Sequence, residues 1–191
     1  MPKYSLYLVL MAAVFLQPFA GLAADDEFKL CARCHGADGN STKSNSPSIA
    51  GMEAGYMEEA MKAYRDGSRA CGLSSMKCKM AAKWTDEEIA ASAAHFAAMK
   101  PVAPEQEFDE GLAAAGKKLH EEHCQACHGE EATEGKPHGS RLNGQWREYL
   151  EYALGQYQEG AWQQPDDMKA ALAKLSQEDK NALLDYYASG Q

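Results

Sequence analysis

The chain has 191 residues, of which 45% are hydrophobic and 25% charged, and its formal net charge at pH 7 is −9. An acidic chain is repelled by phosphate backbones, which excludes nucleic acid as a partner and favours a protein partner with a basic or mixed surface. The length allows one or two domains.

The first 24 residues are typical of an export signal. Lys3 supplies a positive start, Leu6 to Leu16 form an apolar core, and Gly21-Leu22-Ala23-Ala24 offers small residues for cleavage. The alternative is an uncleaved membrane anchor, but this run is shorter than the roughly 20 apolar residues of a spanning helix. No later segment has the composition of a membrane span. We therefore predict cleavage at residues 23–24 and a soluble, periplasmic mature protein.

Two copies of a Cys-x-x-Cys-His motif follow, Cys31-Ala32-Arg33-Cys34-His35 and, 93 positions later, Cys124-Gln125-Ala126-Cys127-His128. This spacing suits covalent haem attachment, because each thiol can add to one haem vinyl group while the histidine is held against the iron. A zinc or iron–sulfur site would leave the histidine of both copies unexplained. The sequence therefore predicts two c-type haems, attached through Cys31, Cys34, Cys124 and Cys127, with His35 and His128 as iron ligands.

The motifs belong to a longer internal repeat. Glycines recur 16 residues apart after each histidine, at positions 51 and 67 in the first copy and at positions 144 and 160 in the second. Between the paired glycines, Tyr56 and Tyr149 occupy equivalent places in a stripe with helical spacing, which predicts one helix in each copy. Thr85 and Ser176 each precede a run of acidic residues, as at the start of a capped helix.

No stretch alternates as a β-strand would, so the fold prediction is all-α. Lys100-Pro101-Val102-Ala103-Pro104 interrupts the helical pattern between the copies, and its prolines suit a semi-rigid linker. We predict a signal peptide over residues 1–24, a first haem domain over 25–100, a linker over 101–108 and a second haem domain over 109–191.

A low-spin electron-transfer haem needs a second iron ligand, usually Met or His. In the second copy, the last helix is expected to start at Leu175-Ser176, and Met168 lies seven residues before Leu175. Met168 is therefore predicted to be that ligand. In the first copy the loop before Trp84 is two residues longer, and seven positions back from Trp84 is Lys77. Placing one extra residue on each side of the ligand selects Met76, and Met80 is the alternative.

The same loop holds Cys71 and Cys78. In an oxidising compartment we expect a disulfide between them. The alternative is a Cu(I) site, because the loop gathers two thiols and two thioethers. Elsewhere, His120 and His123 share a helix with acidic neighbours and are expected to be solvated.

These features resemble the dihaem class I cytochromes of the cytochrome c4 type and, more closely, the dihaem cytochrome subunit of flavocytochrome c sulfide dehydrogenase. The closer resemblance is carried by four segments: Pro47-Ser48-Ile49-Ala50-Gly51, Gly116-Lys117-Lys118-Leu119-His120, Leu142-Asn143-Gly144-Gln145-Trp146 and Tyr186-Tyr187-Ala188-Ser189. It covers essentially the whole mature chain. It implies two tandem class I cytochrome c domains.

The resemblance also implies roles for residues around the haems. The carbonyl of Pro47 would accept a hydrogen bond from the ring N–H of His35 and fix its orientation. Ser140 stands at the equivalent place in the second copy, so a different carbonyl is expected to serve His128. Trp146 and Tyr149 are candidates for hydrogen bonds to haem propionates, with ordinary packing as the alternative.

The implied function is electron transfer by a chain that is not itself an enzyme. A separate FAD-bearing subunit would oxidise sulfide or a related sulfur compound, and this chain would carry its electrons to a soluble acceptor such as a cytochrome c. The chain has no strand–GxGxxG–helix unit, so FAD is expected only on the partner. The alternatives are a free-standing dihaem carrier to a terminal oxidase and a dihaem enzyme, such as a peroxidase or a thiosulfate oxidiser.

Overall fold

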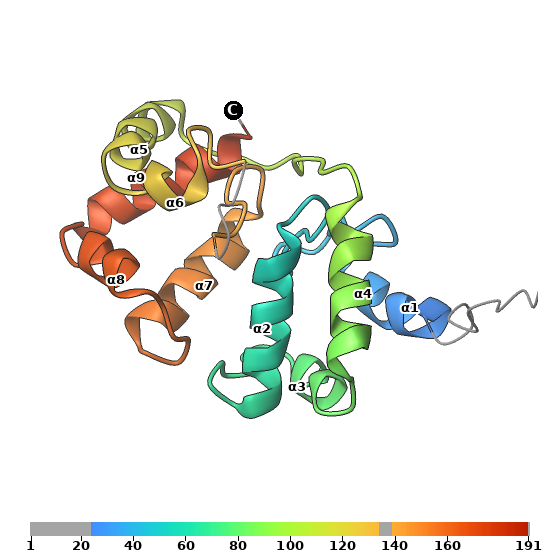
Figure 1. The fold of residues 1–191 in the computed structure, drawn as a ribbon. Helices are drawn as coiled ribbons and strands as arrows, with labels where there is room; N and C mark the ends of the chain where they lie inside the picture. Colours follow the sequence, from blue (N-terminus) through green and yellow to red (C-terminus); the bar gives the residue numbers. More distant parts are fainter. Residues whose placement is uncertain (1–23, 134–138, 191) are drawn as a thin grey trace, which may run out of the picture.

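The structure, a computed structural model, describes residues 24–133 and 139–190, with side chains from residue 28 onward. These ranges hold nine helices and no β-strand (Figure 1), which confirms the all-α prediction. The helices are α1 (Ala24–His35), α2 (Ala54–Asp66), α3 (Met76–Ala81), α4 (Asp86–Ala97), α5 (Glu110–His123), α6 (Gln125–His128), α7 (Arg147–Gln158), α8 (Asp166–Leu172) and α9 (Gln177–Ser189). The predicted signal peptide lies outside the described residues, except for Ala24. None of the described helices could cross a membrane.

The two copies of the repeat form two halves, α1–α4 and α5–α9, joined by an irregular segment (Figure 1). The final helices start as predicted, because Thr85 and Ser176 each make a capping box with the acidic residue three positions on. Each half has its own apolar cluster. Phe96, Met52 and Met57 are buried in the first half, and Leu183, Leu184 and Tyr187 are buried in the second.

Helices α5 and α9 pack closely in the second half. Gly116 of α5 makes this approach possible, because a Cβ at that position would collide with the backbone of Ala182 and Leu183 in α9. In this segment, Ala113, Gly116 and His120 are the buried positions of α5. The small side chains therefore set how near the two helices lie.

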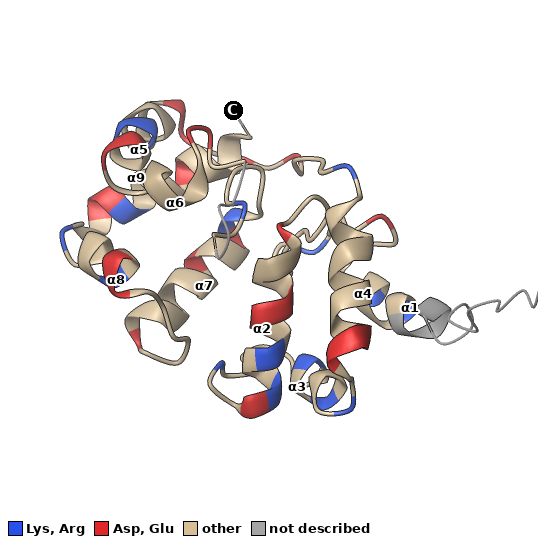
Figure 2. Cartoon of the chain, viewed as in Figure 1, with Lys and Arg blue, Asp and Glu red and all other residues tan. Residues whose placement is uncertain are grey.

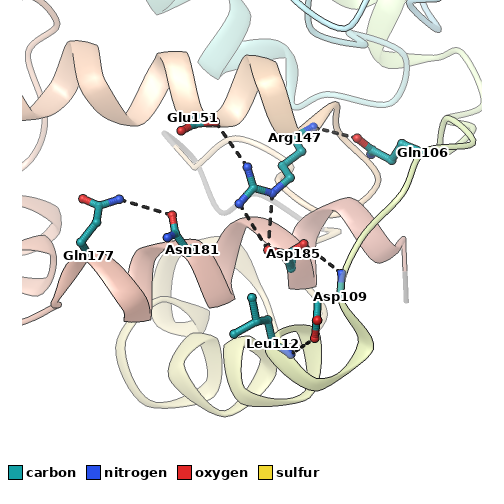
Figure 3. Close-up of polar contacts among 8 residues, drawn as sticks. All are labelled: Gln106, Asp109, Leu112, Arg147, Glu151, Gln177, Asn181 and Asp185. Carbon is teal, nitrogen blue, oxygen red and sulfur yellow. Dashed lines mark hydrogen bonds and ion pairs between the residues drawn. The ribbon is translucent and has the colours of Figure 1, made fainter.

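The predicted linker is held against the second half. The side-chain amide of Gln106 donates to the carbonyl of Gln145 at 2.8 Å. Its oxygen accepts from the backbone N–H of Arg147 at 2.9 Å, a bond drawn in Figure 3. The guanidinium of Arg147 in turn bonds the buried carboxylate of Asp185 on α9. Asp185 also accepts from the backbone N–H of Asp109, where α5 begins (Figure 3). The linker thus fixes the start of α5 and α7 to the end of α9.

The halves are also joined directly by hydrogen bonds. The fully buried side chain of Gln145 accepts from the backbone N–H of Ser48 at 2.9 Å and donates to its carbonyl at 2.7 Å. At the opposite end of the interface, the backbone N–H of Ala70 donates to the carbonyl of Ala161 at 3.1 Å. The indole N–H of Trp162 donates to the carbonyl of Ala70 at 3.0 Å. These bonds hold the halves in one relative position.

Candidate functional site

The first Cys-x-x-Cys-His motif occupies the end of α1. Cys31, Cys34 and His35 all lie in its last two turns, so one helix presents both thiols and the imidazole. The Nδ1 atom of His35 lies 2.8 Å from the carbonyl oxygen of Pro47. This is the contact that the family resemblance implied for these two residues.

The second motif spans two helices. Cys124 is the C-cap of α5, and Cys127 and His128 belong to the single turn of α6. The Nδ1 atom of His128 lies 2.8 Å from the carbonyl oxygen of Ser140. The expectation that a carbonyl other than that of Ser140 serves His128 is therefore wrong. A backbone carbonyl can accept this hydrogen bond whichever side chain its residue carries, so a proline is not required at this position.

His35 and His128 have the same tautomer and the same protonation state. A carbonyl can only accept, so each Nδ1 carries the proton and each Nε2 keeps its lone pair for a metal. Burial lowers the pKa of both His35 and His128, which favours the neutral imidazole that can ligate iron. Both motifs therefore present a histidine in the tautomer that an iron ligand needs.

A cavity of about 390 Å³ lies over the first motif. Its size falls within the range of about 300–1,000 Å³ for small-molecule and cofactor sites. Its wall brings together both thiols of the motif, His35 and the candidate thioethers Met76 and Met80. Apolar side chains cover most of the remainder, among them Met57, Met61, Ile89 and Phe96. This combination of two thiols, imidazole, thioether and apolar wall fits a covalently attached haem.

Both methionine candidates of the first half therefore reach the same cavity. Met76 is the first residue of α3 and is 46% exposed, whereas Met80 lies in the last turn and is half-buried. In the second half, Met168 is half-buried in the first turn of α8. The position in the first turn of a short helix is shared by Met76 and Met168, which favours Met76. Its assignment as the ligand stays a prediction.

Cys71 and Cys78 form a disulfide in the structure, with their Cα atoms 5.8 Å apart. The bond ties the loop before α3 to the first turn of that helix, beside both candidate methionines. A Cu(I) site at this loop would need both sulfurs as thiolates, so the structure does not support the copper alternative.

The two residues suggested for haem propionates lie at the interface between the halves. The indole N–H of Trp146 donates to the carbonyl of Ser41 at 2.7 Å, and a haem contact would require this bond to be given up. Tyr149 belongs to α7 of the second half, yet it lines the cavity of the first. Burial raises the pKa of its hydroxyl well above the usual value, so the group remains a neutral donor.

Two further residues near the sites did not stand out in the sequence. His120, expected to be solvated, is fully buried, with Nδ1 3.0 Å from the hydroxyl of Tyr187 and Nε2 2.7 Å from the carbonyl of Gly129. It thereby holds the residue that follows His128. Arg69 is buried in the wall of the first cavity. One signal was available for His120, because it continues the i, i+3, i+7 stripe of Ala113 and Gly116.

Comparisons with known proteins agree with this geometry. The family model "Cytochrome c" matches residues 26–100, and the model "Cytochrome C oxidase, cbb3-type, subunit III" matches residues 111–186. The chain is 32% identical to cytochrome c4 of Pseudomonas aeruginosa over 185 residues, which covers 87% of this chain and 88% of that protein. The crystal structure of reduced recombinant cytochrome c4 from Pseudomonas stutzeri superposes with a TM-score of 0.73 at 25% identity, covering 87% of this chain and 96% of that one.

Several relatives are named for dehydrogenases of sulfur compounds. The thiosulfate dehydrogenase electron acceptor of Stutzerimonas stutzeri is 30% identical over 173 residues, 83% of this chain and 78% of that protein. The cytochrome subunit of sulfide dehydrogenase from Chlorobaculum tepidum is 42% identical over 66 residues, 35% of this chain and 56% of that protein. The two-domain match and the whole-length relatives confirm the predictions of two covalent haem c groups and of electron transfer. The chain belongs to the dihaem cytochromes c of the cytochrome c4 type.

Proposed function

We propose that this dihaem cytochrome is the electron-accepting subunit of a periplasmic dehydrogenase, taking electrons from an FAD-bearing subunit that oxidises sulfide or a related sulfur compound. It then delivers them to a soluble acceptor such as a small cytochrome c. The observation that carries the proposal is the pairing of two haem motifs in one closely joined molecule. The relatives named as a sulfide dehydrogenase subunit and as a thiosulfate dehydrogenase electron acceptor support the sulfur substrate.

In this proposal the chain's residues hold and tune the haems. The four motif cysteines anchor the porphyrins, and the carbonyls of Pro47 and Ser140 orient His35 and His128. When bound, each haem iron takes up and releases one electron. Ligation by Met76 and Met168 opposite the histidines would raise both reduction potentials, which favours electron flow from a reduced flavin.

The chain on its own would then be a carrier and not an enzyme. If Met76 and Met168 ligate the irons together with His35 and His128, neither iron would have a place left for a substrate. Export to the periplasm follows from the signal-like residues 1–24, and it supplies the oxidising compartment that the Cys71–Cys78 disulfide requires.

The uneven charge supports separate docking faces. Residues 25–100 carry ten Lys and Arg against eleven Asp and Glu, a net −1, whereas residues 101–191 carry eight against seventeen, a net −9. Figure 2 shows acidic residues spread over the helices of the second half. We propose that an acceptor with a basic face docks on the second half, which leaves the first half to the dehydrogenase subunit.

The test is purification from the native host, followed by reduction kinetics. A flavoprotein that co-elutes in fixed ratio, and haem reduction by sulfide only when that flavoprotein is present, are the expected results. A lone dihaem protein that no flavoprotein accompanies, and that sulfide reduces equally fast with or without the other fractions, would reject the subunit assignment.

The second candidate is a free-standing carrier that delivers electrons to a terminal oxidase. It is favoured by the cytochrome c4 relatives, which match along nearly their whole length. Isolation of the lone protein together with rapid oxidation by membranes that contain the oxidase would select it. A dihaem enzyme, the third class, requires an iron with an exchangeable ligand, so rapid cyanide or CO binding at neutral pH would select that class.

A further inference from the structure

Arg69 carries a positive charge that no carboxylate balances within the described residues. Its side chain is 8% exposed, and no Asp or Glu oxygen of those ranges lies within ion-pair distance of its guanidinium. Its Nε is buried and has no hydrogen-bond acceptor. A guanidinium does not lose its proton inside a protein, so this is a buried, permanent cation.

Aromatic rings surround the cation on the protein side. The guanidinium carbon lies 3.7 Å from the ring centroid of Trp162 and 5.2 Å from that of Tyr64. The hydroxyl of Tyr56 is 3.5 Å from Nη2. Ring contacts stabilise a desolvated cation, but by less than the cost of removing an ion from water. The rings alone leave most of that cost without compensation.

The remaining side of Arg69 faces the cavity over the first haem motif. Arg69 lines that cavity together with His35, Cys31 and Cys34. A haem attached at these cysteines brings two ionised carboxylates into the first half. The buried Nε–H and the charge of Arg69 are a hydrogen-bond donor and a counter-charge for such a group.

We infer that Arg69 is the counter-ion of a carboxylate of the first haem and that its charge raises the reduction potential of that haem. The oxidised iron carries one more positive charge than the reduced iron. A fixed cation in a water-poor wall therefore disfavours the oxidised state. Trp162 and Tyr157 of the second half cover the cation, so docking of the two halves keeps water away from it.

The inference concerns the haem placed by Cys31, Cys34 and His35 and does not depend on the identity of the redox partner. The second half has Trp162 at the position equivalent to Arg69. The second haem motif therefore has no cation at that position of the repeat. A test on the isolated dihaem protein therefore remains informative whether or not a flavoprotein partner is found.

The experiment is a spectroelectrochemical titration of R69M, R69K and R65M in the full dihaem protein. Met168→Ala in each background lowers the potential of the second haem and identifies the first. For R69M we expect the ratio of reduced to oxidised first haem at fixed potential to fall about tenfold, which is 59 mV for one electron. R69K keeps the charge and should stay close to the parent protein.

R65M is the matched control, because Arg65 lies four residues away, is exposed and pairs with Asp86 at 2.7 Å. Its loss should leave both potentials unchanged. If R69M shifts the first haem no more than R65M does, the inference is wrong. It is equally wrong if R69K shifts the potential as far as R69M, because packing and not charge would then be responsible. If R69M destabilises the fold, the potential of the first haem in R69K still tests whether the charge is responsible.

Discussion

Arg69 and Trp162 occupy equivalent positions of the repeat, 93 residues apart, and meet each other where the two halves join. They form an isolated antiparallel bridge, with the guanidinium of the first over the ring of the second. Equivalent residues of two copies can touch only close to the axis that relates the copies. The repeat is therefore built as a two-fold pair, with α2 and α7 on the facing sides (Figure 1).

The first prediction concerns the hydrogen bonds at this interface. Gln145→Leu leaves the buried N–H and C=O of Ser48 without partners, which costs about 1–3 kcal/mol for each group. We expect a lower denaturation midpoint and faster proteolysis between the halves, with both haems retained. Gln177→Leu is the control, because Gln177 is exposed on α9. Equal stability of the two variants would mean that the Gln145 contact does not hold the halves together.

The second prediction separates two glycines in helices. Gly116→Ala forces a Cβ into the backbone of α9, and overpacking of this kind costs about 1–3 kcal/mol. A Cβ added at Gly155 of α7 would instead lie in open space. Gly155→Ala should therefore stabilise the protein by about 0.5–1 kcal/mol, since Ala favours a helix. Thermal unfolding of the two variants checks the opposite signs, and a loss of stability in both would contradict the packing argument.

The sequence was sufficient for much of this architecture. The spacing of the haem motifs, the recurring glycines and the caps at Thr85 and Ser176 are local patterns with one physical reading each. The two extra residues before Trp84 also appear in the structure. Gly51 donates to the carbonyl of Phe96 and Gly144 to that of Tyr187. The two donors are 93 residues apart, whereas the two acceptors are 91 residues apart. The first copy is therefore two residues longer between donor and acceptor than the second.

The contacts between the halves could not be read from the sequence. A repeat says which residues are equivalent, but not whether the copies touch, so neither the Gln145–Ser48 bonds nor the position of Arg69 was predicted. His120 was misplaced because acidic neighbours suggested a solvated face. The error had a physical cause, since adjacent residues of a helix point to different sides and only the i, i+3, i+7 neighbours share a surface.

The third prediction concerns the disulfide beside the first haem. Alkylation of the unfolded, unreduced protein should modify neither Cys71 nor Cys78, and reduction should expose two thiols. The double variant C71S/C78S should lose about 2–3 kcal/mol if chain entropy dominates, as expected for a loop of about seven residues. Two reactive thiols before reduction would contradict the disulfide and reopen the copper alternative.

The fourth prediction is a pH dependence that originates at His120. Burial lowers the pKa of His120 in the folded protein below its ordinary value near 6.5. As the pH falls through 6.5, the unfolded chain takes up a proton that the folded chain refuses, so stability decreases toward acid. His120→Gln should flatten the profile of unfolding free energy between about pH 7.5 and 5.5. An unchanged slope in His120→Gln would mean that other groups produce the pH dependence.

The fifth prediction decides the distal ligand of the first haem. Met168→Ala should remove the methionine–iron charge-transfer band of the second haem and leave that of the first. In this background, Met76→Ala should abolish the remaining band and lower the potential of the first haem, because a thioether ligand raises it. Met80→Ala should keep the band and cost only packing, about 2–5 kcal/mol if the side chain becomes fully buried around the haem.

The reverse result, with the band lost in Met80→Ala and kept in Met76→Ala, would move the ligand to the last turn of α3. The Cys71–Cys78 bond would then fix the start of the ligand helix and not the ligand itself. Retention of the band in both single variants would exclude both methionines. In that case the ligand must be sought among the other thioethers that line the cavity, Met57 and Met61 of α2.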